Sequence, residues 1–496
     1  MSIWLNDDEL AETAPAERIG FGSPVPTRIV SNGEYVPAPQ TPQQARVEHE
    51  LAVLADLHGA RLGMDRRKFL KTGCGMAAAF LAMNRVYGAL FDVGIAEAAE
   101  PEAAAARAAG LRGQPVIDVQ LHFVRDDFSW DGILELGEYA KRWNPVLERE
   151  GVTMQRYKFE NFLKEVFLDS DTNVGLVSAA PSDDPSHSIV SNADLARARA
   201  IVNEIAGSRR MLSHSVIRPG FPGWLDEIDQ ALAEFRPDSW KGYTVGDPLE
   251  PSKHPWRMDD EKLVYPAYEK MVKSGVRTLC IHKGLLPADY ESSVEHWRHA
   301  KVDDVGQAAK DWPQLTFVIY HSGLKPFMTS PDESLAQFEQ SGRMDWVTDL
   351  AEIPAKYGVS NVHGELGTAF ASSAVTHPRH AAALLGTLIR GMGTDHVLWG
   401  TDSVWYGSPQ WQIEAFRRIE IPADMQKKHG FAPLGAADGA TKSAILAGNA
   451  ARLYGLDLKA IAQSAKIDRL AVQKREYEAS GAERSNLAYG FVRAAT

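Results

Sequence analysis

Five side chains that can bind a metal ion or move a proton stand in or directly after short apolar runs of this 496-residue chain. They are Gln120, His122, His282, His321 and Asp402. Imidazole and carboxylate groups are common ligands of a catalytic zinc ion, and histidine is the side chain best suited to proton transfer near neutral pH. If the fold brings these residues together, their types predict an active site.

The stretch VIDVQLHFV, residues 116–124, shows this pattern most clearly. Successive residues of a strand point to opposite faces, so Asp118, Gln120 and His122 share one face and apolar residues take the other. A carboxylate, an amide and an imidazole in a row beside an apolar face favour an active-site strand.

Eight short apolar runs recur from residue 113 onward at the spacing of a strand plus a helix. They begin at Val116, Val174, Met211, Ser239, Arg277, Thr316, Asn361 and His396. Helix-like stretches such as DLARARAIVNEIAG separate them, and such alternation indicates parallel βαβ units. The count of eight predicts an α/β fold, a (β/α)₈ TIM barrel. A doubly wound open sheet is the main alternative, but no G-x-G-x-x-G motif follows the first run.

A barrel makes a demand on the candidate residues. His122, His282, His321 and Asp402 each close one of the apolar runs. The carboxyl ends of barrel strands meet at one face, which carries the active site in such enzymes. We therefore expect these side chains to converge.

Composition limits the partners of the protein. A net charge of −12 argues against a nucleic-acid binder, which would show a basic face. The two cysteines, Cys74 and Cys280, are too few for a disulfide framework. We expect a small-molecule substrate, no nucleic acid and no stable membrane span, and a homodimer stays open.

Four segments differ in composition and periodicity. We expect residues 1–63 to form an irregular N-terminal extension, 64–112 a signal and linker, 113–456 the barrel, and 457–496 a C-terminal helical tail.

The second segment carries a candidate export signal. Arg66 and Arg67 precede Phe-Leu-Lys and a Gly/Ala-rich apolar run at 73–83. This run is shorter than the roughly 20 residues needed to cross a bilayer. A basic start before a short apolar run is the anatomy of a signal peptide, and the paired arginines resemble a twin-arginine signal. We expect export to the periplasm or the outside. The alternative is a basic amphipathic helix in a cytoplasmic protein.

Several motifs follow one another in a specific order. They are DVQLH, IHKG, YHSGL, WGTDS and the ending ILAGNAARLYGL. Together they resemble the amidohydrolase superfamily, in the branch of aminocarboxymuconate-semialdehyde decarboxylase, resorcylate-type decarboxylases and lactone hydrolases. The resemblance covers about residues 113–456.

The resemblance implies one divalent metal ion, zinc or manganese, at the barrel mouth. It places ligands at His122, His282 and Asp402, and a general acid/base at His321, with Asp402 also taking part in catalysis. The family has His-x-His or Glu-x-His on the first strand, whereas this chain has Gln120 at the first of these ligand positions. A neutral amide is a poorer ligand for a transition metal, so Gln120 leaves the occupancy of the site open.

Four further residues are candidates for substrate binding. Arg218, Lys241 and Lys283 could bind a substrate carboxylate, and Trp405 could line an aromatic pocket. Trp399 fits either that pocket or the barrel core.

These features predict a metal-dependent hydrolase acting on a small cyclic or aromatic carboxylate or lactone. A non-oxidative decarboxylase (a carboxy-lyase) on the same type of substrate is the alternative. A second alternative is a catalytically inactive barrel that serves as a binding protein, which the altered ligand Gln120 favours.

Overall fold

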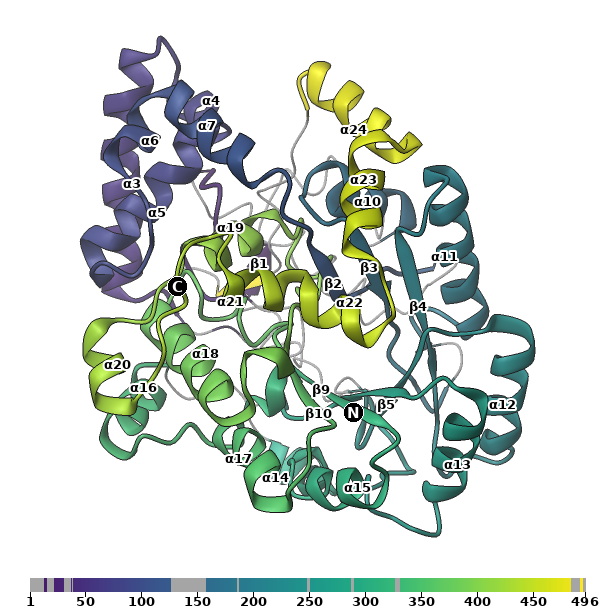
Figure 1. Ribbon diagram of the computed structural model, residues 1–496. Coiled ribbons are helices and arrows are strands. Elements are labelled where there is room, and N and C mark those ends of the chain that lie inside the picture. The colour runs from purple at the N-terminus through teal and green to yellow at the C-terminus, as the bar shows by residue number, and fades with distance from the viewer. Residues whose placement is uncertain are drawn as a thin grey trace.

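The computed structural model describes residues 13–15, 22–30, 37, 39–125, 158–184, 187–247, 250–286, 290–325, 331–482 and 491–493. Eight strands form one parallel sheet at the centre, and helices surround it (Figure 1). In sheet order they are β2 (Ile117–Leu121), β3 (Val174–Val177), β4 (Met211–Val216), β5 (Ser239–Tyr243), β8 (Thr278–His282), β9 (Thr316–Tyr320), β10 (Val362–Glu365) and β11 (Val397–Leu398). Each expected apolar run contains one of these strands.

The sheet closes between its first and last strands. Leu121 forms a parallel bridge with Ser403, which follows β11. Val119 donates a backbone hydrogen bond to Trp399 (3.0 Å), and the Asp402 amide donates one to Gln120 (2.9 Å). The fold is therefore a TIM barrel, as the eight runs predict.

Helices lie between successive strands and after the last one, and they cover the barrel. They are α10 (Phe159–Leu163), α11 (Asn192–Ala206), α12 (Trp224–Gln230), α13 (Tyr265–Ser274), α14 (Tyr290–Ser293), α15 (Val305–Asp311), α16 (Pro331–Ser341), α17 (Val347–Tyr357), α18 (Pro378–Met392), α19 (Gln410–Arg418), α20 (Ala423–His429), α21 (Ala440–Ser443) and α22 (Asn449–Leu453). The ends of α11 follow from its sequence, because Ser191 and Asp194 form a capping box and Gly207 ends it in the left-handed conformation.

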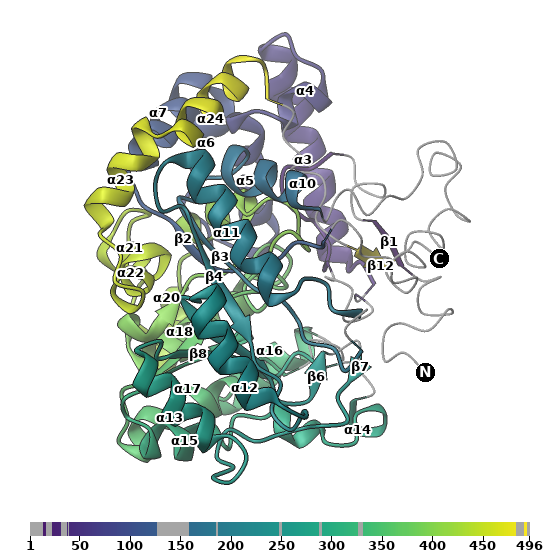
Figure 2. The same ribbon diagram turned by 90° about the vertical axis from the view of Figure 1, so that its right-hand side faces the viewer.

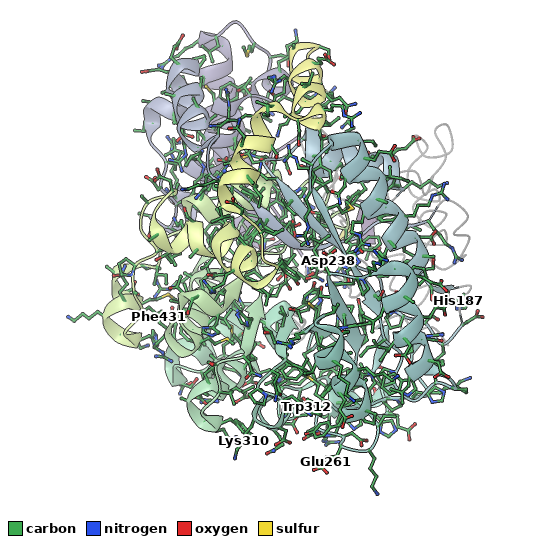
Figure 3. The ribbon with its side chains drawn as sticks, turned by 45° about the vertical axis from the view of Figure 1, so that its right-hand side comes forward. His187, Asp238, Glu261, Lys310, Trp312 and Phe431 are labelled. Atoms are coloured by element: carbon green, nitrogen blue, oxygen red, sulfur yellow. The ribbon has the colours of Figure 1, made fainter. Side chains whose placement is uncertain are left out.

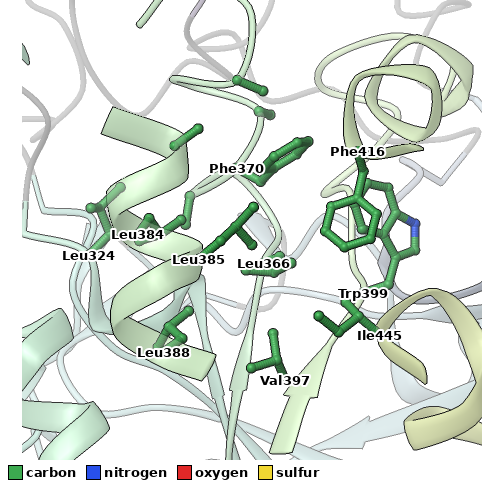
Figure 4. Packing of buried hydrophobic residues seen from close by; sticks show 14 of the residues in the cluster. Leu324, Leu366, Phe370, Leu384, Leu385, Leu388, Val397, Trp399, Phe416 and Ile445 are labelled. Atoms are coloured by element: carbon green, nitrogen blue, oxygen red, sulfur yellow. The ribbon is translucent and has the colours of Figure 1, made fainter. Parts of the chain in front are cut away.

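Leucines of α18 pack against the residues that follow β10 (Figure 4). Trp399 is fully buried there, with its ring centroid 5.0 Å from Phe416 and 5.8 Å from Phe370. This decides between the two roles left open for Trp399: it belongs to the core.

A partly buried carboxylate also ties the wall of the barrel together. Asp238 precedes β5 and accepts hydrogen bonds from Arg199, Arg209 and the backbone of Ser213 (Figure 3). These bonds join α11 to β4 and β5 at their amino-terminal ends.

Residues 42–111 form an N-terminal helical unit beside the barrel, coloured purple to blue (Figure 1). Its helices are α3 (Pro42–Arg61), α4 (Arg66–Leu70), α5 (Gly73–Tyr87), α6 (Ile95–Ala99) and α7 (Pro101–Leu111). Residues 42–61, expected to be irregular, are the helix α3. A capping box of Thr41 and Gln44 starts it, and Val47, Leu51 and Leu54 bury one face at helical spacing.

The apolar run of the candidate signal forms α5, which is buried within this unit. Residues from Ala77 to Phe80 are fully buried. The unit also joins the barrel, through a bridge between Phe91 and Ile419 and an ion pair between Glu97 and Arg418. Arg66 and Arg67, by contrast, are exposed on α4. Export stays a prediction.

The C-terminal tail is helical in α23 (Leu458–Ile467) and α24 (Arg469–Ala479). Beyond it, β12 (Phe491–Arg493) pairs antiparallel with β1 (Thr13–Pro15), so segments from the two ends of the chain lie side by side (Figure 2). Within the described ranges, none of the helices combines the length and apolar character needed to cross a membrane.

Candidate active site

The five candidate residues meet at the carboxyl ends of the barrel strands. Gln120 and His122 come from β2 and its end, His282 ends β8, His321 follows β9 and Asp402 follows β11. Each is at most 3% exposed. We refer to these five residues as the site cluster.

Asp402 lies at one end of the cluster with its carboxylate surrounded by donors. Its Oδ1 accepts from Gln120 Nε2 (3.0 Å) and lies 3.1 Å from His122 Nε2, while Oδ2 accepts from the Thr368 hydroxyl. Burial alone would raise the pKa of Asp402, but the hydrogen bond and charge of His122 outweigh it and bring the pKa to about 2. Asp402 is therefore ionised at neutral pH.

His321 and His282 form the other end, and their proton positions follow from one carbonyl. His321 Nδ1 lies 2.8 Å from the Gly367 oxygen, which can only accept, so Nδ1 carries a proton. In a neutral ring, Nε2 of His321 is then a lone pair, and His282 Nδ1, 3.1 Å away, must donate to it. This leaves a lone pair on His282 Nε2, for which the described residues supply no hydrogen-bond partner.

Both rings are neutral at physiological pH. Burial lowers the pKa of His321 to about 4, even though the charge of Asp402 works in the opposite direction. Burial also lowers the pKa of His282 well below its usual range, with further lowering by His321 and Lys241. A neutral His282 can accept a proton.

Glu365, at the end of β10, is a site residue that the motifs did not identify. Its Oε2 accepts from the backbone N–H of His321 (3.1 Å) and its Oε1 from that of Gly367 (2.6 Å). Together with the bond from His321 to Gly367, these contacts form a closed ring that fixes the imidazole. Burial raises the pKa of Glu365 to about 8. The only signal in the sequence is a carboxylate at the end of the seventh apolar run.

The backbone of the site is held in a costly conformation. His321 and Asp402 both have φ of 60°, and Thr368 has 55°, in the left-handed region. Such residues cost roughly 1–3 kcal/mol each and collect at functional sites.

Asp118 shares a strand face with Gln120 but has a different partner. It accepts hydrogen bonds from the backbone and hydroxyl of Thr401 and from the backbone of Gln120. It therefore fixes β2 to the segment after β11, while Gln120 and His122 enter the cluster.

Two of the expected substrate-binding residues lie beside the cluster. Lys241 on β5 is fully buried with its Nζ 3.3 Å from the ring centroid of Tyr320. Burial is the main cause that lowers the pKa values of His282 and His321, and the charge of Lys241 lowers both further. Trp405 stacks on His122 with ring centroids 5.7 Å apart. A cation and an aromatic face suit a cyclic anion.

Lys283 and Arg218, the two other residues expected to bind substrate, have partners outside the cluster. The Nζ of Lys283 donates to both carboxylate oxygens of Asp304 at 2.8 Å and to the carbonyl of His299 at 2.6 Å. An ammonium group has three hydrogens, so none is left for a substrate. Arg218 pairs with Glu227 and lies over the ring of Phe221.

The arrangement does not fit the divalent metal that the resemblance implies. In the described part of the chain, no three His, Cys, Asp or Glu side chains are grouped so that they could hold a metal ion. Instead the expected ligand atoms face one another or the Gln120 amide, as in the contacts between His122 Nε2 and Asp402 and between His321 Nε2 and His282. No step is therefore derived through a metal.

A family model described as amidohydrolase matches residues 117–456. Among solved structures, an uncharacterized TIM-barrel protein from Bordetella bronchiseptica is 15% identical, covering 70% of this chain and 99% of that one with a TM-score of 0.42. A 2,6-dihydroxybenzoate decarboxylase from Rhizobium is 13% identical (69% and 99% covered, TM-score 0.40). A 5-carboxyvanillate decarboxylase from Novosphingobium aromaticivorans with bound manganese is 14% identical (70% and 99% covered, TM-score 0.40). No curated protein matches the chain. Matches at these levels assign no substrate.

Proposed function

Since this chain belongs to the amidohydrolase family, we propose that it is an enzyme that hydrolyses a small cyclic or aromatic carboxylate or lactone. One observation carries the proposal: the buried lone pair of His282 Nε2, oriented by His321, lies in the same cluster as the ionised Asp402. A neutral imidazole with an unused nitrogen is a general base.

In hydrolysis, His282 Nε2 would take a proton from water while the water oxygen attacks the substrate carbonyl carbon. The ammonium group of Lys241 would stabilise the oxyanion that forms. The protonated His282 would then give its proton to the leaving oxygen as the carbon–oxygen bond breaks. We expected this acid/base role at His321, but both of its nitrogens already have partners. We therefore assign His321 to positioning His282.

The burial of the cluster favours a second candidate, non-oxidative decarboxylation of the same type of substrate. A carboxylate that leaves water for a site where every cluster residue is at most 3% exposed loses its hydration, which favours release of CO₂. Lys241 would hold the carboxylate, and as the bond between the ring carbon and the carboxyl carbon breaks and CO₂ leaves, the ring carbon would take a proton that comes from solvent.

Product analysis in labelled water tests both candidates. The purified full chain would be incubated with a panel of lactones and hydroxybenzoates in H₂¹⁸O and in D₂O, followed by mass spectrometry. Hydrolysis places one ¹⁸O in the product carboxylate, whereas decarboxylation releases CO₂ and places deuterium on carbon.

Two histidine variants complete this test. His282→Asn should abolish turnover. His363→Asn should not, because His363 is buried outside the cluster, with its ring 4.8 Å from that of His396. If the wild type binds members of the panel and converts none, the enzyme proposal fails for them and the binding-protein alternative gains support.

A further inference from the structure

The amide of Gln120 lies between the two halves of the site cluster. Its Nε2 is 3.0 Å from Asp402 Oδ1 and 3.5 Å from His321 Nε2. An amide nitrogen carries two hydrogens: Asp402 Oδ1 accepts one, and the other makes a long contact with the His321 Nε2 lone pair, which already accepts from His282 Nδ1. Gln120 thus links the His122–Asp402 pair to the His282–His321 pair, with a firm bond to the first and a long contact to the second.

Hydrogen-bond donors already surround Asp402, the carboxylate among the expected ligands. Three side chains approach its two oxygens: Gln120, His122 and Thr368. A divalent cation that bound Asp402 would have to displace these donors, and binding at His122 Nε2 would also require removal of the proton that this nitrogen directs at Asp402. The contacts satisfy the carboxylate without that exchange.

The backbone around Gln120 leaves room for its amide. A Cβ on Gly367 would lie 2.1 Å from Gln120 Oε1, and a Cβ on Gly400 would lie 3.1 Å from Gln120 Cβ and 1.8 Å from Glu365 Oε1. Only glycine can stand at these two positions while the Gln120 amide and the Glu365 carboxyl keep their places. The missing Cβ atoms therefore leave room for the amide, whose Oε1 is buried with no hydrogen-bond partner among the described residues.

The charges near the cluster also disfavour a divalent metal ion. Lys241 is fully buried beside the cluster with its Nζ 3.3 Å from the ring centroid of Tyr320, so this part of the barrel already holds one buried cation. Two further buried carboxyls on the barrel strands have other partners: Glu365 accepts from two backbone N–H groups, and Asp118 accepts from Thr401 and the backbone of Gln120. A divalent ion would add buried positive charge without a partner, which is unfavourable.

We propose that this active site assembles without a metal ion, and that the Gln120 amide joins Asp402 to His321 in place of one. Any effect of the Gln120 amide on turnover rests on the proposed function. The absence of metal does not, because metal content is measured without a substrate. The proposal predicts that the departure from His-x-His or Glu-x-His is what excludes the metal. A carboxylate or imidazole at position 120 should then create a metal site.

Metal content and titration test the proposal. The full chain, its Gln120→Glu and Gln120→His variants, and a control would be dialysed against zinc or manganese and measured by elemental mass spectrometry. Binding would also be followed by calorimetry with each metal alone. The wild type should retain far less than one metal per chain. At least one variant should bind at least about 10-fold more tightly, the lower end of effects seen for changes around a metal.

The matched control is Gln44→Glu. Gln44 is also a buried glutamine, 1% exposed, and at position N3 of a capping box it can be replaced by glutamate. Gln44→Glu should bind metal no better than the wild type, whereas equal gains in all variants would mean adventitious binding and overturn the proposal. One zinc or manganese per wild-type chain that survives dialysis would also overturn it, whatever the substrate assays show. A wild type without metal and without turnover would instead contradict the proposed function alone.

Discussion

The N-terminal helical unit and the site cluster are both buried, but they bury opposite kinds of side chain. Helix α5 places alanines, Phe80 and Met83 in the interior, and each large apolar side chain stabilises the fold by about 1.5–3 kcal/mol. The cluster buries imidazoles, an amide and a carboxylate, which cost free energy unless each is hydrogen-bonded.

The helical unit therefore contributes to the stability of the fold, whereas the cluster contributes to catalysis. The helical unit offers apolar contacts and no reactive group among its fully buried residues from Ala77 to Phe80. The cluster gives up stability through burial and left-handed backbone at His321 and Asp402, and gains neutral histidines and a fixed lone pair. Variants in the two regions should therefore fail in different assays.

The largest effect on activity is expected within the cluster. His321→Asn should reduce turnover by about 10² to 10⁴, the usual contribution of general acid–base catalysis, because His282 loses the partner that orients its lone pair. kcat with the substrate found in the labelling experiment is the measurement. A positioning role also predicts that the pH–rate profile shifts with the variant. Unchanged kcat and profile would remove His321 from the machinery.

Lys283→Met should instead cost stability, by about 3–5 kcal/mol, because it leaves the Asp304 carboxylate buried without its cation. Urea unfolding measures this loss. Lys241→Met is the matched variant: it also removes a fully buried lysine, but one beside the cluster. We expect it to reduce turnover more than Lys283→Met does in the fraction that remains folded, and the reverse order would contradict the assignment of the two lysines.

In the helical unit, Leu54→Ala should destabilise the fold by about 2–5 kcal/mol, through lost burial and the cavity that it leaves. The folded fraction should keep the kcat of the wild type, because Leu54 lies in α3 and not in the cluster. Thermal unfolding and kcat measured on the same sample check this. A fall in kcat at full folding would link the unit to catalysis.

The cluster should also make stability depend on pH. Burial lowers the pKa of His321 from 6.5 to about 4, so between these values the unfolded chain binds the proton more tightly. Stability is therefore highest above pH 6.5 and falls by roughly 3 kcal/mol as the pH drops towards 4, at about 1.4 kcal/mol per pKa unit. Urea unfolding between pH 7 and pH 4 should show a shallower fall for His321→Asn than for Leu54→Ala. Equal slopes would mean that His321 is not the source of the pH dependence.

The smallest effect on stability is expected at the exposed arginine pair. Arg66 pairs with Asp56 while their side chains are 41% and 56% exposed, so replacing Arg66 and Arg67 with lysine should change stability by less than about 1 kcal/mol.

We propose that the protein is exported by the twin-arginine route to the periplasm or the outside, and the same double variant should then abolish export of the full chain. Because α5 is buried in the folded unit, the exported protein should keep residues 42–111, which intact-mass measurement checks. Unchanged export, or a cytoplasmic wild type, would contradict the proposal.

The sequence by itself determined the barrel and the five side chains of the site cluster that meet at its carboxyl ends. Strand and helix periods are local properties, so eight apolar runs predict eight strands, and polar residues at their carboxyl ends must meet once the sheet closes. Partner choice is not local. His282 and Lys283 are neighbours in one motif, yet only the first enters the cluster, because the fold brings Asp304 to the second. Likewise, only the tertiary structure decided that the Gln120 amide faces Asp402 and that Glu365 holds His321. The contact between Gln120 and Asp402 joins residues that are 282 positions apart in the chain, and the contact between Glu365 and His321 joins residues that are 44 positions apart. A hydrogen bond forms only where the fold brings both partners together.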